Sequence, residues 1–219
     1  MLDIIPVGLA PDYVPYLDGW ELQRRIHADV VSGDRPDTLL LLEHEAVYTA
    51  GRRTRPEDLP RDGSPVIDVD RGGRITWHGP GQLVGYPIVR LPDPRDVVGY
   101  VRGLERRLIA ALHGFGVPGQ QVEGRSGVWI VRPGLPDAKI AAIGVRVAAG
   151  VTMHGFSLNC DNDLDGFGGI TPCGISDAAV TTISAVLDRP VTPRDLLGAV
   201  SAAFGADTAY APIRAEAAA

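Results

Sequence analysis

Lysine and cysteine are both scarce in this sequence. Lysine occurs once, at Lys139, although the chain has 21 basic residues, and cysteine occurs twice, at Cys160 and Cys173. Two cysteines are too few for the disulfide framework of a small secreted protein, and a reducing cytosol would keep both as thiols. Arginine does not lose its proton in a protein, whereas a desolvated lysine can. Lys139 is therefore either an ordinary surface lysine in an arginine-rich sequence or a residue required for proton transfer.

The chain also lacks the marks of membrane proteins and nucleic-acid binders. No apolar run approaches the roughly 20 residues that a membrane span needs. The N-terminal stretch MLDIIPVGL has neither the basic region nor the small-residue cleavage site of a signal peptide. A net charge of −6 gives no basic footprint for nucleic acid. We expect a cytoplasmic protein with no nucleic-acid partner and no membrane partner.

What is present fits one α+β domain over residues 1–213, with a frayed tail at 214–219. Residues 12–31 and 96–115 have helical spacing of apolar residues, and Gly33 marks the end of the first helix. The final helix opens at Thr192, with Pro193 and Asp195 in its first turn. Strands are expected at residues 4–9, 38–42, 65–69, 85–89, 127–131, 139–147 and 151–159. This pattern predicts a mixed, mostly antiparallel sheet covered by helices.

A glycine-rich stretch, RGGRITWHGPGQLVGYPI, runs from Arg71 to Ile88. Glycines let backbone amides approach a ligand closely, and Arg71 and Arg74 bring charge to the same loop. The alternative is an elaborate turn between strands. No Gly-Lys-Ser/Thr follows and GxGxxG is absent, so the stretch does not support nucleotide binding.

A second stretch, ITPCGISD, places Cys173 between a proline and a glycine. Ser176 or Asp177 could cap a helix through residues 178–187, and a thiol just ahead of a helix N-terminus is favoured as thiolate. The alternative is a small buried hydrophobe, although a Pro-Cys-Gly turn is a poor place to bury one. Cys160, which ends a strand, is interpreted as structural.

The third candidate is a hairpin over residues 139–159, joined by Ala148-Ala149-Gly150. Strict alternation would place Lys139 on one face with Ala141, Ile143 and Val145, among small apolar neighbours. His154 lies on the partner strand, where a lone histidine is more often structural.

Together these segments closely resemble the lipoyl(octanoyl) transferase family, within the superfamily of biotin and lipoate protein ligases. The matching strings are EHEAVYTAGRR, RGGRITWHGPGQLVGYPI, GRSGVW, AKIAAIGVR, HGFSLN and TPCGISD, which follow one another in order from Glu43 to Asp177. The resemblance implies a biotin/lipoate protein ligase-like fold and an octanoyltransferase that needs no cofactor and no metal.

The resemblance also implies roles for individual residues. The family cysteine falls on Cys173, which would accept the acyl chain as a thioester, and the family lysine falls on Lys139, which would activate that thiol. Lys139 could act as a neutral base or as a thiolate-stabilising ammonium. His78 and His154 would have supporting or proton-relay roles. The residues implied to line the acyl pocket are Arg71, Gly72, Gly73, Arg74, Ile75, Thr76, Trp77, His78, Ala142, Ile143, Gly144, Gly155, Phe156 and Ser157.

The implied reaction transfers octanoyl from octanoyl-acyl carrier protein to a lysine ε-amine, the first step of endogenous protein lipoylation. The implied acceptors are the lipoyl domains of 2-oxoacid dehydrogenase complexes and the glycine cleavage H protein. Carrier proteins are acidic and so is this chain, so docking would need a local basic patch. The candidates are Arg52, Arg53, Arg55, Arg71 and Arg74. We expect a monomer.

Three alternatives stay open at this stage. An ATP-dependent lipoate or biotin protein ligase would bind adenylate in the glycine-rich loop and would not need Cys173. A Cys–His thioesterase would use Cys173 with His154 or His78 and release free fatty acid. A non-catalytic module that binds acyl carrier protein would have no turnover, so replacing Cys173 with serine would change none.

Overall fold

A computed structural model of the chain describes residues 2–170 and 179–205. Within them, eight strands form one large sheet in the order β1-β2-β6-β10-β9-β8-β7, with β11 beside β9. Its strands are β1 (Asp3–Gly8), β2 (Thr38–Leu42), β6 (Gln82–Ile88), β7 (Gln120–Val122), β8 (Arg125–Ile130), β9 (Ala138–Ala148), β10 (Val151–Asn159) and β11 (Ala179–Val180). The pairs β1–β2 and β9–β11 are parallel and the other pairs are antiparallel. The α+β fold with a mixed, mostly antiparallel sheet is thus confirmed.

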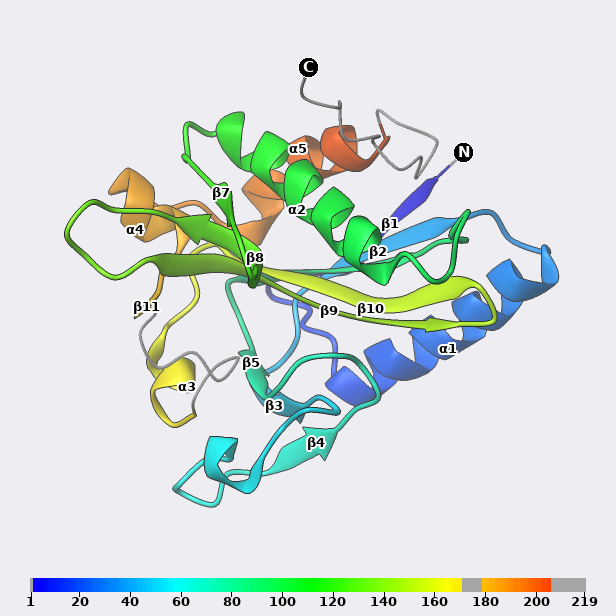
Figure 1. Ribbon diagram of the computed structural model, residues 1–219, viewed down its shortest axis with the longest axis horizontal. Helices are drawn as coiled ribbons and strands as arrows, with labels where there is room; N and C mark the ends of the chain where they lie inside the picture. The colour runs from blue at the N-terminus through cyan, green and yellow to red at the C-terminus, as the bar shows by residue number, and fades with distance from the viewer. Residues whose placement is uncertain (1, 171–178, 206–219) are drawn as a thin grey trace.

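A smaller sheet lies beneath the large one in Figure 1 and has the order β4-β3-β5. Its strands are β3 (Val47–Ala50), β4 (Val66–Asp68) and β5 (Thr76–His78), with the 3₁₀ turn η1 (Pro56–Asp58) between β3 and β4. Neither β3 nor β5 was predicted, because each is short and the second lies inside the glycine-rich stretch. This small sheet holds that stretch opposite the β9–β10 hairpin.

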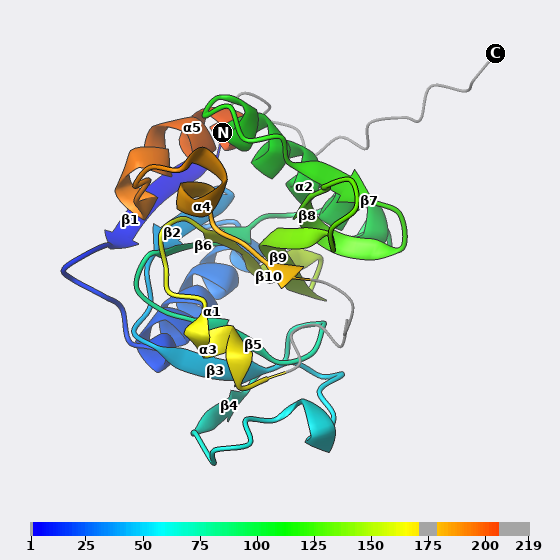
Figure 2. The same cartoon turned by 90° about the vertical axis from the view of Figure 1, so that its left-hand side faces the viewer.

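Helices cover both faces of the large sheet (Figure 1). Helices α2 (Val97–His113) and α5 (Pro193–Gly205) lie on one face, and α1 (Tyr16–Ser32) lies on the other. The short helices α3 (Asp165–Gly168) and α4 (Ile183–Leu187) lie near the end of the sheet that carries β11 (Figure 2). No helix in the described residues is long and apolar enough to cross a membrane.

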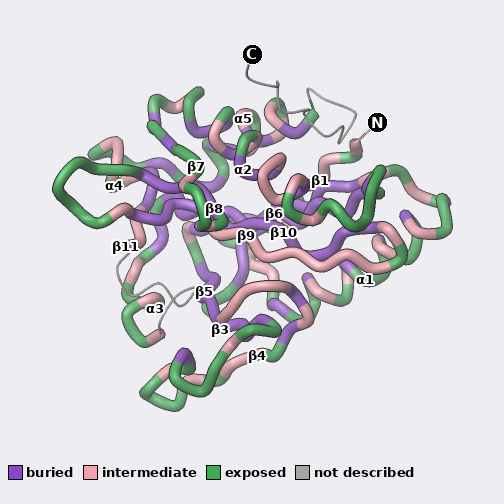
Figure 3. Tube along the Cα trace, in the orientation of Figure 1, coloured by how far each residue is buried: buried purple, intermediate pink, exposed green. Residues whose placement is uncertain are grey.

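The two faces of the sheet carry two apolar cores. In β2, Leu39 and Leu41 pack toward α2 and α5, whereas Leu40 and Leu42 pack toward α1, and all four are fully buried. A strand covered on both faces reads as a continuous apolar run, as this one does. Figure 3 shows the same buried band running through the centre of the sheet.

Helix α1 begins later than predicted, at Tyr16 rather than at residue 12. Pro15 precedes the first turn, and the residue before a proline is pushed out of helical geometry. The end is as predicted, because Gly33 adopts a left-handed conformation with φ of 89°. The later start matters for the site, because it places Tyr16 at the tip of the helix.

Candidate active site

A cavity of about 750 Å³ lies between the large sheet and the glycine-rich stretch. At one end its lining residues are exposed, namely Arg52, Arg53, Arg55, Gly124 and Ser126. At the other end they are buried, namely Tyr16, His78, Val84, Tyr86 and His154. The gradient from exposed to buried residues defines a mouth and a deep end.

A β-bulge places Lys139 in this cavity. Val128 pairs with Ala141, yet the next residue, Trp129, pairs with Lys139, so β9 carries one extra residue there. Ile140 and Ala141 both pack into the core on the α2 side. Lys139 therefore shares the cavity face with Ala142 and Gly144. The alternation predicted from the sequence was wrong at this point, because one inserted residue reverses every side chain beyond it.

Lys139 is 8% exposed, and its Nζ lies 4.7 Å from the ring centroid of Trp129. Val180 of β11 pairs with Lys139 in parallel register, and Thr181 donates a backbone hydrogen bond to the carbonyl of Lys139. The chain that leaves residue 170 thus returns to the sheet at the lysine. The side chain of Lys139 is therefore buried in the site and is not an ordinary surface lysine.

Most of the predicted pocket residues line the cavity together with Lys139 and His154. They are Arg71, Gly73, Arg74, Ile75, Thr76, His78, Ala142, Ile143, Gly144, Gly155, Phe156 and Ser157. Gly72 and Trp77 are not among the lining residues. The roles of all of them stay predictions, but the sequence segments that carry them do meet in space.

Trp77 points away from the cavity because side chains alternate along β5. Its ring packs edge-on against Phe167 of α3, and it also lies directly beneath Gly166, where an added Cβ would come within 2.5 Å of the ring. Tyr48 donates a hydrogen bond to the Gly166 carbonyl at 2.8 Å. Trp77 therefore packs against α3 and does not line the cavity.

Phe156 also directs its side chain elsewhere. Its ring stacks on Phe204 of α5, on the opposite face of the sheet, with the centroids 5.4 Å apart. Ile143 likewise packs against the core on that side. The floor of the cavity is consequently made by small residues, Ala142, Gly144, Gly155 and Ser157.

Arg71 organises the loop over this floor. It is 7% exposed, and its guanidinium donates to the carbonyls of Gly72, Arg74 and Thr49 at 2.8–3.0 Å. The Gly72 amide donates to the Val145 carbonyl at 3.0 Å, and a Cβ on Gly144 would lie 3.0 Å from the Gly72 carbonyl oxygen. The loop thus contacts the sheet at a glycine, where a Cβ would crowd the Gly72 carbonyl oxygen.

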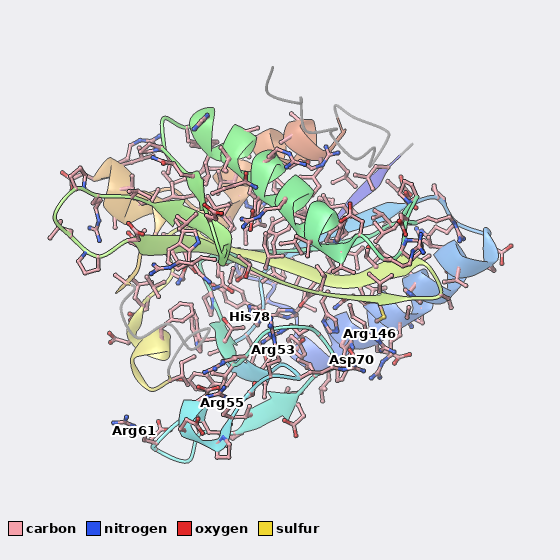
Figure 4. The ribbon with its side chains drawn as sticks, viewed as in Figure 1. Arg53, Arg55, Arg61, Asp70, His78 and Arg146 are labelled. Carbon is pink, nitrogen blue, oxygen red and sulfur yellow. The ribbon has the colours of Figure 1, made fainter. Side chains whose placement is uncertain are left out.

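Asp70 ties the same loop to β10 and β9. Its Oδ1 lies 2.7 Å from Nε2 of His154, and Arg146 donates to its other oxygen (Figure 4). Burial lowers the pKa of His154, against the opposing effect of Asp70. Burial alone would raise the pKa of Asp70, but the hydrogen bond and charges of His154 and Arg146 lower it. Asp70 is therefore an ionised partner that orients His154.

His154 has a backbone conformation that is rare for a residue with a side chain, with φ of 57°. Its amide donates to Oε1 of Gln23 on α1, at 2.9 Å. Such geometry costs free energy and persists only where the surroundings hold it. The contacts of Gln23 and Asp70 hold His154 in this conformation from both sides.

His78 is held by a chain of side-chain amides. Its Nδ1 lies 2.7 Å from Oε1 of Gln82, and Nε2 of Gln82 donates to Oδ1 of Asn159 at 2.9 Å. Because the amide nitrogen of Gln82 is the donor to Asn159, its oxygen must accept from Nδ1 of His78. Burial, with the charge of His44 next, lowers the pKa of His78 to about 3. His78 is therefore a neutral imidazole with the lone pair on Nε2.

His44 and Tyr86 form a second fixed pair at the deep end. The Val14 carbonyl can only accept, so Nδ1 of His44 donates to it at 2.7 Å, and the Tyr86 hydroxyl then donates to Nε2 at 2.6 Å. Burial lowers the pKa of His44 to about 4. Tyr16 packs on His44 with the ring centroids 4.9 Å apart, and burial raises the pKa of its hydroxyl to about 12.

Four of the five arginines predicted to dock a partner differ from Arg71. Arg52, Arg53 and Arg55 are exposed and Arg74 is half-buried, and all four border the mouth. Arg74 is paired with Asp58 at 3.2 Å and Arg55 with Glu57 at 3.7 Å. Arg71 is buried within the loop, so it cannot contact a docked protein directly.

Cys173 and the rest of the TPCGISD motif lie outside the described residues. The helix predicted over 178–187 is different in its described part. Residues 179–180 form β11, and α4 begins only at Ile183 with Thr182 as its cap. The cap of α4 is therefore Thr182, and not Ser176 or Asp177. Cys160 is fully buried, and burial raises the pKa of its thiol well above its usual range.

Several site residues carry no signal in the sequence alone. Tyr16 lies far from the recognised strings, Asp70 precedes the glycine-rich motif by one residue, and Gln82 lies inside that motif but was given no role. Their positions become meaningful only when α1, the loop and β6 meet. The string GRSGVW was recognised as part of the family resemblance, but Arg125 and Ser126, which line the cavity, were not predicted as site residues.

The chain matches a known protein family over most of its length. The sequence model of the lipoyl protein ligase A/B catalytic domain matches residues 15–205. An octanoyltransferase of Clavibacter sepedonicus is 63% identical over 201 residues, which cover 90% of this chain and 87% of that protein. One of Thermobifida fusca is 61% identical over 191 residues, covering 85% and 81%.

Several solved structures share the fold of this chain at low sequence identity. The bipartite lipoate protein ligase of Thermoplasma acidophilum superposes with a TM-score of 0.67 at 13% identity, over 94% of this chain and 82% of that one. A lipoate-protein ligase A solved with ATP gives 0.63 at 12% identity, over 94% and 83%. At this identity the likeness concerns the fold alone.

The chain belongs to the lipoyl protein ligase A/B catalytic-domain family. Its high-identity relatives place it among the octanoyltransferases of that family, so it is an enzyme of the acyltransferase class.

Proposed function

We propose that this enzyme takes octanoyl from octanoyl-acyl carrier protein, holds it as a thioester on Cys173, and transfers it to a lysine ε-amine of a lipoyl domain. The single observation that carries the proposal is Lys139, which is buried, faces the cavity, and is paired with the strand that follows the Cys173 segment. Sequence identity to octanoyltransferases supports the acyl group.

In the first half-reaction the thiolate of Cys173 attacks the carbonyl carbon of the carrier thioester. A new carbon–sulfur bond forms, the bond to the carrier arm breaks, and the departing thiolate takes the proton that Cys173 gave up. Lys139 is the group proposed to hold that proton in between. A thiol of ordinary pKa is only partly ionised at neutral pH, so it needs such a partner.

In the second half-reaction the acceptor amine attacks the Cys173 thioester. The amide bond forms, the carbon–sulfur bond breaks, and the amine proton passes by way of Lys139 to the released thiolate. Exchange between thioesters is nearly balanced and conversion of a thioester to an amide is downhill, so the sequence of steps needs no ATP.

Binding of the acyl chain is assigned to the slot between the glycine-rich loop and the small-residue floor. Burying about six methylenes there would contribute roughly 5 kcal/mol at about 0.8 kcal/mol each. The four arginines at the mouth are proposed to meet the acidic carrier protein, since local potential rather than net charge steers encounter. The acceptors proposed are the lipoyl domains of 2-oxoacid dehydrogenases and the glycine cleavage H protein. The working form is proposed to be a cytoplasmic monomer.

The test is transfer of octanoyl to a purified lipoyl domain, followed by the mass of that domain. Octanoyl-acyl carrier protein without ATP should modify it, whereas free octanoate with ATP should not. Modification only in the second mixture would mean a ligase, and release of free octanoate without a modified domain would mean a thioesterase.

A further inference from the structure

We propose that Trp129 is a positioning residue for acyl transfer, and that the face of its indole ring holds the ammonium of Lys139 at the reaction site. The contact that carries the inference is the 4.7 Å separation between Nζ of Lys139 and the centroid of the Trp129 ring. Trp129 is not among the residues that line the cavity, so it acts through Lys139 and not on the acyl group. The inference rests on the proposed function for the role of Lys139 in proton transfer.

Trp129 lies on the cavity side of the sheet and is nevertheless fully buried. Its neighbours Val128 and Ile130 both pack into the core on the α2 side, so alternation directs the indole ring to the opposite face. Trp129 belongs to neither apolar core of the described residues, and its indole N–H donates no hydrogen bond to any of them. What the ring offers its surroundings is therefore its face, which is where the ammonium lies.

The β-bulge sets Lys139 directly across from this ring. After the pair Val128–Ala141, a regular antiparallel register would pair Trp129 with Ile140, yet Trp129 pairs with Lys139. Side chains of directly paired residues on neighbouring strands contact each other. The irregular register thus brings the single lysine of the chain onto the tryptophan.

Gly127 leaves room for the methylenes of the lysine. Its φ of 106° lies in the region that favours glycine, and a Cβ there would lie 2.4 Å from the Ala141 carbonyl oxygen and 3.4 Å from Cε of Lys139. Glu105 is fully buried and accepts a hydrogen bond from the Gly127 amide at 2.8 Å. The side chain of Lys139 consequently runs past a fixed backbone to reach the ring.

A second cation contacts the same ring. In the described residues, the two strands that flank Lys139 contribute one further charged side chain, Arg125 of β8, whose Cζ lies 5.5 Å from the ring centroid. Arg125 is paired with Asp137 at 3.7 Å. A desolvated ring attracts a cation more strongly than an exposed ring, and the attraction exists only while the amine carries its proton. Trp129 therefore stabilises Lys139 in the state that has received the proton of Cys173.

The experiment measures alkylation of Cys173 by iodoacetamide across pH, which requires no acyl substrate and no turnover. Modification is followed by the mass of the peptide that carries Cys173. The proteins compared are wild type, Lys139→Met, Trp129→Leu and Trp129→Phe, and each Trp129 variant combined with Lys139→Met. The kcat and KM for transfer from octanoyl-acyl carrier protein are measured on the same proteins.

Trp129→Leu should move the alkylation profile of Cys173 to higher pH by about half a unit to one unit, and should lower kcat about three- to tenfold with little change in KM. Trp129→Phe keeps an aromatic face, so its effect should be smaller and in the same direction. In the Lys139→Met background, replacement of Trp129 should add no further change, because the ring then has no cation to hold. A tryptophan with a merely structural role would cause the same loss in both backgrounds.

Equal shifts in the wild-type and Lys139→Met backgrounds would overturn the inference. If Trp129→Leu does not fold, Trp129→Phe provides the same comparison. A Lys139→Met profile that moves while the profiles of the Trp129 variants do not would overturn the inference alone. A Lys139→Met profile that matches wild type would contradict the proposed function as well.

Discussion

Nδ1 of His78 lies 2.7 Å from Oε1 of Gln82, and the same glutamine donates from its nitrogen to Asn159. This arrangement leaves the other imidazole nitrogen of His78 without a proton. Asn159 continues the chain to the carbonyl of Thr181, immediately after β11. The orientation of a histidine in the cavity is thus tied to the strand that follows the Cys173 segment.

Gln82→Leu should release His78 and leave its Nδ1–H and the Asn159 oxygen without their partner. We expect a loss of about 1–3 kcal/mol in the free energy of unfolding, as for other buried polar groups left unpaired. Turnover should also fall, because the His78 ring is no longer fixed. Urea unfolding and imidazole nitrogen shifts measure the two effects.

Gln82→Glu is the informative companion variant. It keeps an acceptor for His78 and adds a charge, so the pKa of His78 should rise rather than its tautomer change. A His78 tautomer that is the same in Gln82→Leu as in wild type would contradict the role given to Gln82.

Acid should destabilise the enzyme through its buried histidines. Burial lowers the pKa of His44 from 6.5 to about 4, so the unfolded chain binds more protons than the folded one between these values. The stability that depends on neutral His44 is fully present above about pH 6.5 and is lost as the pH falls toward 4. Between pH 4 and pH 6.5, His44→Gln should reduce the pH dependence of the free energy of unfolding by at most about 1.4 kcal/mol per pH unit.

The control for this prediction is His113→Gln, which removes an exposed histidine at the end of α2. It should leave the pH dependence close to that of wild type. Equal slopes in wild type and His44→Gln would mean that His44 is not held neutral by burial.

The mouth arginines should act on encounter with the carrier protein. Arg53→Glu should lower kcat/KM for octanoyl-acyl carrier protein by about tenfold at low salt, mainly through KM, and the difference should shrink as salt is added. Arg95→Glu makes the same change in charge on the connection between β6 and α2, away from the cavity lining, and should have little effect. If both variants lose the same activity, net charge rather than this patch governs docking.

Substitution of Lys139 tests whether turnover requires proton transfer or only a positive charge at this position. Lys139→Arg keeps the positive charge and removes the ability to give up a proton, so turnover should fall about 10²–10⁴-fold. The turnover of Lys139→Met should fall at least as far. Near-normal turnover of Lys139→Arg in steady-state kinetics would show that charge alone suffices.

Much of this site could be read from the sequence, and what could not has specific causes. The glycine-rich loop, Lys139 and the HGFSLN strand were predicted to meet, and they do. The face of Lys139 was not predictable by alternation, because a bulge inserts one residue between Lys139 and Ala141. The helix proposed at Ala178 was likewise wrong at its start, because pairing with β9 draws residues 179–180 into the sheet.

The residues that orient the histidines were missed for a different reason. Asp70 and Gln23 contact His154 across 84 and 131 residues of chain, and Gln82, although only four residues from His78, is itself oriented by Asn159, 77 residues away. No local pattern of apolar spacing or turn residues contains that information. It follows only from the packing of α1 and the loop against one sheet.

The central claim is a covalent octanoyl-enzyme on Cys173. The most direct measurement is the intact mass of the protein after mixing with octanoyl-acyl carrier protein, in the absence of ATP and acceptor, for wild type, Cys173→Ser and Cys160→Ser. The account predicts an added octanoyl group in wild type and Cys160→Ser and none in Cys173→Ser. An unchanged mass in all three proteins, with modification of a lipoyl domain only when ATP is supplied, would contradict it.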